Sequence, residues 1–237
     1  MLFAILNGER VEAKPKTKAI CQLCGQLVLS KCGEVNIWHW AHQKNESCDN
    51  WFEHETEWHK NWKLIFGKDN CEKPICKDNS KHIADIYTKE EVVIELQNSS
   101  IEKAVIRKRE DFYGEKMIWV INGKHFKENF LITRFLILED MEYYHRHNPL
   151  SKYYGKNNDS WKFEFDFSWS WCRKTWRDVQ RHVFIDFGDE NLYWIKEGMG
   201  MARGKCMEVS KAKFVQKYGG DLALLQTIID NPGERTL

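Results

Sequence analysis

The clearest alternation of apolar and polar residues lies in residues 161–171, WKFEFDFSWSW. Because successive side chains of a strand point to opposite faces, this segment predicts a long amphipathic strand. Its aromatic face has the chemistry to stack on the bases of a single nucleic-acid strand, but burial in a protein core is the commoner fate of such a face. The aromatic positions are Trp161, Phe163, Phe165, Phe167, Trp169 and Trp171.

Residues 51–67 carry large apolar side chains at helical spacing instead. Trp51, Trp58 and Trp62 fall on one stripe, which is the pattern of a helix that buries one face. We expect this helix to end at Gly67, since glycine is common directly after a helix. Further helices are expected near residues 100–113 and 209–230.

Shorter apolar runs predict strands. Two such runs, at residues 83–87 and 92–96, flank the polar residues 88–91. Runs of β-branched and aromatic residues on either side of a short polar break indicate a β-hairpin. The other runs that predict strands lie at residues 117–122, 183–187 and 191–195.

Polar or irregular segments separate these elements. We interpret residues 68–81 as a loop, and residues 139–160, which end in GKNNDS, as a domain boundary or an exposed insertion. Residues 1–50 have the pattern of short strands and turns around cysteines and histidines.

The net charge of +1 over 237 residues excludes a global basic field as the basis of nucleic-acid binding. Lysine and arginine outnumber the acidic residues locally, in residues 101–134 and 171–217. Such stretches suit a local phosphate-binding surface, and they suit an ordinary solvated face equally well.

The N-terminal residues lack the apolar run and the small-residue cleavage pattern of a signal peptide. No segment approaches the roughly 20 apolar residues that span a bilayer. We therefore expect a cytoplasmic protein without a membrane span, whose eight cysteines are mostly reduced or bound to metal.

The N-terminal region carries a pattern of metal ligands. Cys21 and Cys24 form a C-x2-C turn, which supplies two thiolates to a zinc ion, and His39 and His42 follow. The two histidines are closer together than in a zinc finger, which favours a compact structural knuckle. Cys48 is an alternative to one histidine as a zinc ligand. In a second alternative, one or both histidines do not bind zinc and are turn or surface residues.

The predicted hairpin carries the residues with the clearest catalytic chemistry. Asp85 lies in its first strand, and Glu95 and Gln97 share one face of its second strand. Two acids held together in a partly buried place repel each other unless a proton or a cation joins them, and Mg²⁺ suits such oxygen ligands. The bare spacing D-x9-E-x-Q, taken alone, favours the simpler interpretation of a solvated hairpin face.

On the expected helix, Glu55, His59 and Lys63 fall at i, i+4 and i+8, along the margin of the tryptophan stripe. Glu57 is expected to point away from that line and Glu53 to lie opposite it. An ordinary salt-bridge network explains this line of residues when it is considered alone.

Taken in order, these motifs resemble the CoiA-like competence proteins, a branch of the PD-(D/E)XK nuclease superfamily. The matching pieces cover about residues 1–123. They are FAILNGERVEA, the C-x2-C knuckle, the Gly33 to His42 element, ETEWHKNWK, ADI, VIELQNSSI and KREDFYGEKMIWVING.

The resemblance implies a catalytic centre. Asp85 and Glu95 would bind a catalytic Mg²⁺ or Mn²⁺, and Gln97 would take the place of the superfamily lysine. Glu55 and His59 would belong to the same centre. Because a neutral amide neither supplies positive charge nor takes a proton, another residue or a second metal would have to cover that role.

The resemblance also implies an α/β fold with a mixed sheet flanked by helices. Lys63 and His59 are candidates for the role of the missing lysine, and Lys63, Ser99 and Arg109 are candidates for contacts with nucleic acid. The expected domains are a zinc-binding β module at 1–50, a restriction-endonuclease-like PD-(D/E)XK core at 51–138, and an aromatic-rich β/α extension of unknown role at 139–237.

The expected function is that of a magnesium-dependent deoxyribonuclease, a hydrolase that acts on single- or double-stranded DNA in uptake, recombination or defence. Two alternatives stay open. One is a nucleic-acid-binding module without catalysis, which would bind DNA with steep salt dependence. The other is an adaptor whose aromatic C-terminal region docks a DNA-processing protein. The joint presence of Glu55, Asp85 and Glu95 argues against a decayed site.

Overall fold

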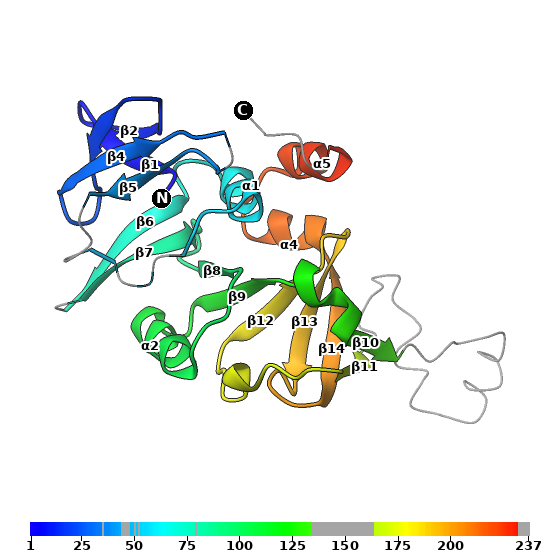
Figure 1. Ribbon diagram of the computed structural model, residues 1–237. Helices are drawn as coiled ribbons and strands as arrows, with labels where there is room; N and C mark the ends of the chain where they lie inside the picture. Colours follow the sequence, from blue (N-terminus) through cyan, green and yellow to red (C-terminus); the bar gives the residue numbers. More distant parts are fainter. Residues whose placement is uncertain are drawn as a thin grey trace, which may run out of the picture.

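In the computed structural model, the described strands form two sheets, one of five strands and one of nine (Figure 1). The structure describes residues 1–34, 36–43, 48–49, 51, 53–78, 80–133 and 164–231. The larger sheet contains both parallel and antiparallel neighbours. The expectation of a mixed α/β fold is therefore confirmed.

The smaller sheet is the N-terminal module, and its strands run antiparallel in the order β2-β1-β3-β4-β5. Small and aromatic side chains fill its core, with Trp40 at 1% exposure as the largest. The strands are β1 (Phe3–Leu6), β2 (Glu9–Glu12), β3 (Lys18–Ile20), β4 (Leu27–Lys31) and β5 (His39–His42).

The larger sheet has the order β10-β11-β14-β13-β12-β9-β8-β7-β6. Strand β9 (Met117–Asn122) lies parallel to both of its neighbours, β8 (Val93–Gln97) and β12 (His182–Asp186). The others are β6 (Cys71–Lys77), β7 (Ser80–Tyr87), β10 (Phe130–Thr133), β11 (Glu164–Trp169), β13 (Asn191–Glu197) and β14 (Arg203–Ser210).

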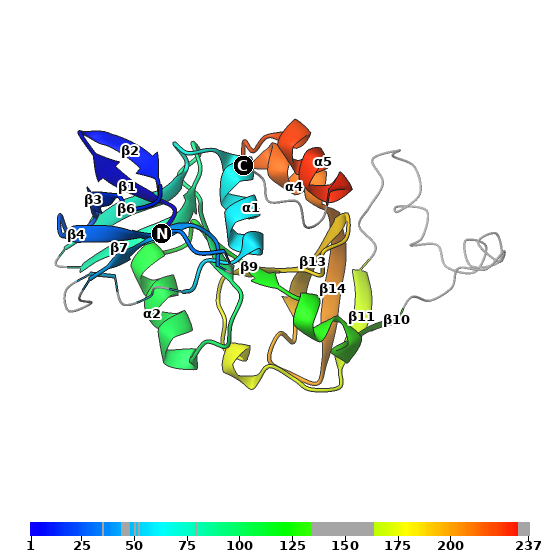
Figure 2. The same ribbon diagram turned by 45° about the horizontal axis from the view of Figure 1, so that its top comes forward.

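Helices cover both faces of this sheet. Figure 2 shows α1 (Glu57–Phe66), α4 (Lys211–Lys217) and α5 (Leu222–Asp230) on one side and α2 (Lys103–Tyr113) on the other. Every residue of β8 and β9 is buried as a result, which is the usual state of strands in parallel pairs covered on both sides. The short 3₁₀ helices are η1 (Lys124–Asn129) and η3 (Lys174–Trp176).

Helix α1 begins later than the tryptophan spacing predicts. Thr56 caps it, because the Thr56 side chain accepts a hydrogen bond from the backbone nitrogen of His59, and Gly67 follows its last residue with a φ of 78°. Residue 51 and residues 53–55 lie outside the helix. Trp51 therefore does not belong to the stripe and stacks on His82 instead.

Two other expectations need correction. The segment expected to be a loop at residues 68–81 contains strand β6, which pairs with β7 along its length. The single helix expected near residues 209–230 is split into α4 and α5, capped by Ser210 and Asp221, and Gly219 between them has a φ of 77°. Most residue types avoid that conformation, so the helix ends there.

The described part of the aromatic segment forms strand β11, which ends at Trp169, two residues earlier than its pattern predicts. Phe167 and Trp169 are buried in the core, whereas Trp171 lies beyond the strand and is 78% exposed. Trp161 and Phe163, like residues 139–160, lie outside the described residues. The boundary at residue 138 stays a prediction, although β11 to β14 continue the same sheet as β6 to β9.

The C-terminal half holds helix α1 in place through Asp186. One carboxylate oxygen of Asp186 accepts hydrogen bonds from the indole nitrogens of Trp58 and Trp62, at 2.9 Å each, and the other accepts one from Lys211 Nζ at 2.8 Å. Burial would raise the pKa of Asp186, but Lys211 and the Trp58 indole outweigh it and lower that pKa below its ordinary value. The carboxylate therefore stays charged and joins α1, α4 and β12.

We expect Asp186→Asn to lower the free energy of unfolding by about 3 to 5 kcal/mol at pH 7, because Lys211 would be left as an uncompensated buried charge. Since the pKa of Asp186 is depressed in the folded protein, this stabilisation is present above pH 3.8 and is lost as the pH falls below it. Urea unfolding at pH 7 and pH 3 measures both effects. Asp189→Asn, which alters a partly exposed pair with Lys127, is the control and should cost less than about 1 kcal/mol. Equal losses in the two variants would contradict this role of Asp186.

Candidate active site and metal centre

The two hairpin carboxylates lie where β7 and β8 stop pairing. The backbone register between these strands consists of Ile86 with Ile94 and Tyr87 with Val93. Beyond it, Asp85 Oδ2 accepts a hydrogen bond from the Leu96 nitrogen at 2.9 Å, and Glu95 Oε1 accepts one from the Asp85 nitrogen at 3.3 Å. Side-chain carboxylates thus replace the backbone ladder, which places Asp85 and Glu95 side by side.

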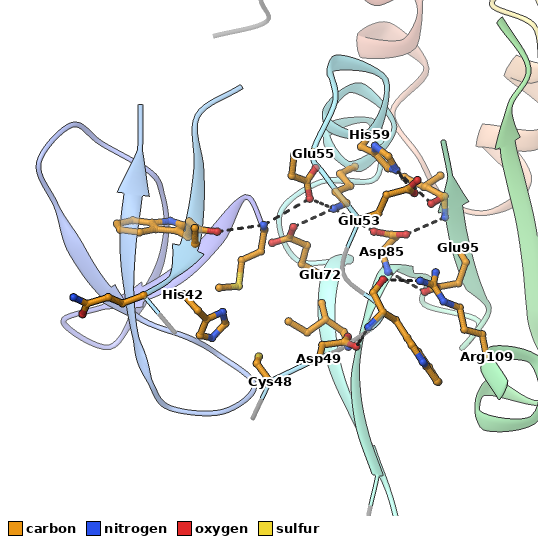
Figure 3. Close-up of a pocket in the computed structure, with 18 residues that line it drawn as sticks. His42, Cys48, Asp49, Glu53, Glu55, His59, Glu72, Asp85, Glu95 and Arg109 are labelled. Carbon is orange, nitrogen blue, oxygen red and sulfur yellow. Dashed lines mark hydrogen bonds and ion pairs between the residues drawn. The ribbon is translucent and has the colours of Figure 1, made fainter. Parts of the chain in front are cut away.

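Both carboxylates line a cavity of about 240 Å³ between the N-terminal module, helix α1 and the strands of the large sheet (Figure 3). The cavity is strongly acidic for its size. Its carboxylates are Asp49, Glu53, Glu55, Glu72, Asp85 and Glu95. Among the described residues, the cationic side chains that line it are those of Lys63 and Arg109, and the N-terminal ammonium of Met1 lies 3.9 Å from Glu55 Oε1. The imidazole rings of His42 and His59 line it as well.

Lys63 is the central cation of this cavity. Its ammonium lies 2.5 Å from Glu55 Oε1, 3.0 Å from Glu72 Oε1 and 3.2 Å from Asp85 Oδ1, and its side chain is 3% exposed. Burial would lower the pKa of Lys63, but these carboxylates outweigh it and raise that pKa well above its ordinary value. Lys63 therefore remains protonated and supplies fixed positive charge.

Glu95 has a different environment. Arg109 Nη1 donates to Glu95 Oε2 at 3.0 Å from helix α2, and Glu95 is 3% exposed. Burial and then the charge of Asp85 raise the pKa of Glu95 to about 8, against the opposing effect of Arg109. A carboxylate in this state readily takes a proton or shares a cation with its neighbour.

Glu53 belongs to the site, although helical spacing predicted that it would lie opposite Glu55 and His59. It contacts His59 Nε2 at 3.3 Å and accepts hydrogen bonds from the backbone nitrogens of Asn98, at 3.1 Å, and Ser99, at 2.5 Å. Burial raises the pKa of Glu53, but the hydrogen bonds from His59 and Ser99 outweigh it and lower that pKa to about 2. The capping residue Thr56 was the available signal, since a helix that begins there leaves Glu53 outside it.

The side chain of Gln97 contacts Glu53 and Ser99 and lies outside the cavity. Its side-chain nitrogen donates to Glu53 Oε1 and to the carbonyl oxygen of Ser99, both at 3.1 Å. Because both partners only accept hydrogen bonds, the nitrogen must face them. The amide oxygen is buried without a partner among the described residues, and Gln97 does not line the cavity.

The structure thus brings Glu55, His59, Lys63, Asp85, Glu95 and Arg109 together around one cavity. Gln97 and Ser99 lie just behind it, on Glu53. The individual roles of these residues stay predictions.

A second group of ligands borders the same cavity. The ligand atoms of Cys21, Cys24, His42 and Cys48 all lie within 4.8 Å of one another. The sulfur atoms of Cys21 and Cys48 are 3.7 Å apart, and Cys24 Sγ is 3.3 Å from His42 Nε2. Zinc–sulfur bonds of about 2.3 Å at tetrahedral angles separate two sulfurs by about 3.8 Å, so the donor set fits zinc.

His39 lies outside this group, which corrects its expected place among the ligands. His39 and His42 are three residues apart on strand β5, so their side chains leave opposite faces. His39 Nδ1 lies 2.7 Å from the carbonyl oxygen of Ile37 instead. Cys48 supplies the fourth ligand atom, as the alternative interpretation of the sequence allowed.

Comparison with protein families finds matches for two parts of the chain. The model of the competence protein CoiA N-terminal domain matches residues 6–50, and that of the CoiA nuclease-like domain matches residues 75–165. The chain belongs to the CoiA-like competence proteins. In this CoiA-like chain, the first match contains the Cys₃His group and the second contains Asp85, Glu95 and Arg109. No curated protein and no solved structure matches it at a significant level.

Within the described part of the CoiA-like chain, no helix is both long enough and apolar enough to cross a membrane.

Substitution of Cys48 and His39 tests the ligand set. We expect the purified chain to hold one zinc ion, Cys48→Ala to lose most of it, and His39→Ala to retain it, because His39 points away from the other ligands. Metal analysis after dialysis measures the zinc content. Loss of zinc in His39→Ala with retention in Cys48→Ala would contradict the assignment.

Proposed function

We propose that this CoiA-like protein is a magnesium-dependent nuclease that hydrolyses phosphodiester bonds of DNA during uptake or recombination. The observation that carries the proposal is the pairing of Asp85 with Glu95 where β7 and β8 part, in a domain that matches a nuclease-like family. The proposal includes a PD-(D/E)XK core, formed by this hairpin, by the parallel partner β9 and by helix α2.

The residues of the cavity fit a Mg²⁺ ion. Asp85 and Glu95 offer oxygen ligands, and Mg²⁺ is usually bound by one or two carboxylates together with waters and phosphate oxygens. Glu55 adds a buried carboxylate oxygen, Oε2, that has no partner among the described residues. The raised pKa of Glu95 supports the same conclusion, since a nearby cation relieves repulsion between two carboxylates.

Four residues that line the cavity have distinct roles in this proposal. Asp85 and Glu95 would hold the Mg²⁺ ion, which when bound neutralises charge on the phosphate and lowers the pKa of a coordinated water. Arg109 orients Glu95 through its 3.0 Å contact. Lys63 keeps its proton and therefore supplies positive charge beside Asp85 and does not act as a base.

Lys63 thereby covers the role that Gln97 cannot fill. Gln97 holds Glu53, and Glu53 in turn contacts His59. The amide thus supports the carboxylate behind the cavity, and the positive charge comes from helix α1.

One observation favours a second candidate function. Asp85 and Glu95 are each paired with a cation of the chain itself, Lys63 and Arg109. A site neutralised in this way needs no metal for its stability. The alternative is therefore a module that binds nucleic acid, or adapts a DNA-processing protein, without catalysis.

Cleavage assays distinguish these functions. We expect the purified chain to cleave labelled single- or double-stranded DNA with Mg²⁺ or Mn²⁺ and to be inactive with EDTA. Glu95→Gln and Asp85→Asn, which remove charge at little change in shape, should lower the rate by at least about a hundredfold. The control Glu91→Gln alters an exposed glutamate of the same hairpin and should leave the rate unchanged.

Unaltered metal-dependent cleavage by Glu95→Gln would show that the assignment is wrong. DNA binding by the unaltered chain without cleavage in either metal would favour the alternative function.

A further inference from the structure

The Cys₃His group and the acidic cavity share a wall. His42 and Cys48 belong to the group of four ligands and also line the cavity that contains Asp85 and Glu95 (Figure 3). The next residue along the chain, Asp49, lines the same cavity. A closed zinc site usually contributes folding energy to its own module, whereas here its ligands lie directly beside a second site.

Asp49 connects that wall to strand β7. Its Oδ2 accepts a hydrogen bond from the Ile83 nitrogen at 2.8 Å, two residues before Asp85. Its Oδ1 lies 2.9 Å from His82 Nδ1 and accepts a hydrogen bond from the Trp51 nitrogen at 2.9 Å. Asp49 therefore joins the chain next to Cys48 to strand β7, two residues from Asp85.

The connection continues to Glu95 through Trp51. The carbonyl oxygen of Trp51 accepts a hydrogen bond from Arg109 Nη2 at 2.5 Å, and Arg109 Nη1 donates to Glu95 at 3.0 Å. The Trp51 ring also stacks on His82 and lies 5.6 Å from the Arg109 guanidinium carbon. From Asp49, one path therefore leads along β7 to Asp85 and another leads through Trp51 and Arg109 to Glu95.

We propose that Asp49 is a positioning residue through which zinc at the Cys₃His group orders both carboxylates of the cavity. Zinc fixes Cys48, Cys48 fixes the adjacent Asp49, and Asp49 fixes β7 and Trp51. The proposal rests on zinc binding by the chain, and its consequence for cleavage rests on the proposed nuclease function. Substitution of residues that lie behind a site and orient its ligands commonly lowers metal affinity or activity by 10- to 100-fold.

Asparagine at position 49 is the informative substitution. The Trp51 and Ile83 nitrogens donate to different oxygens of Asp49, and asparagine has a single acceptor oxygen. One of the two N–H groups would therefore face an N–H₂ group. The zinc ligands themselves are unchanged in Asp49→Asn, so zinc content should stay at one ion per chain.

Hydrogen exchange on the full chain, with and without a zinc chelator, tests the coupling in the absence of Mg²⁺ and DNA. In the unaltered chain, removal of zinc should speed amide exchange at residues 82–85 by at least about tenfold, while the buried strand β9 keeps its protection. Asp49→Asn should show the fast exchange with zinc still bound. Asp111→Asn, on the exposed face of α2, should behave like the unaltered chain.

Three results would overturn the proposal: a chain that binds no zinc, exchange at β7 that zinc removal leaves unchanged, or zinc-dependent protection that persists in Asp49→Asn. A failure of the nuclease function gives a different result. In that case the exchange pattern follows the prediction, while the unaltered chain cleaves no DNA with Mg²⁺ or Mn²⁺.

Discussion

Repulsion among buried carboxylates is the constraint around which this protein is built. Six acidic side chains line one small cavity, and like charges a few ångströms apart cost on the order of 4 kcal/mol per pair at the effective dielectric of a protein. Lys63 from α1 and Arg109 from α2 reduce that cost from opposite faces of the sheet. The positions of both helices are therefore part of the chemistry of the site.

Distant parts of the chain hold those helices. Asp186, from a strand of the C-terminal half, binds both indoles of α1 and so sets the helix that carries His59 and Lys63. The N-terminal module closes the other side of the cavity with His42 and Cys48. The N-terminal module, the central part with the hairpin and α1, and the C-terminal half thus all contribute to one site. A role for the C-terminal half follows from this contact, since it supports the cavity from behind.

The sequence was most informative where local pattern and chemistry coincide. Asp85 and Glu95 stand in two apolar runs across a short break, so their proximity in a hairpin could be predicted, and the C-x2-C spacing identified Cys21 and Cys24. Glu53 was misplaced because the tryptophan spacing, which extends back to Trp51, outweighed the capping signal of Thr56 at the true start of α1. Cys48 and His39 could not be ranked because ligand choice depends on which face of β5 each histidine leaves. The contacts of Asp186 with Trp58 and Trp62 join residues more than 120 positions apart, which no local pattern reveals.

The central claim is that a divalent cation binds between Asp85 and Glu95. Without the cation, these carboxylates are paired with Lys63 and Arg109. Anomalous diffraction from crystals of the full chain grown with Mn²⁺ tests it most directly, because manganese and zinc are distinguished by their absorption edges. The account predicts a manganese peak within coordination distance of both Asp85 and Glu95, separate from a zinc peak among Cys21, Cys24, His42 and Cys48. Manganese bound elsewhere, with Lys63 and Arg109 still the partners of Asp85 and Glu95, would contradict it.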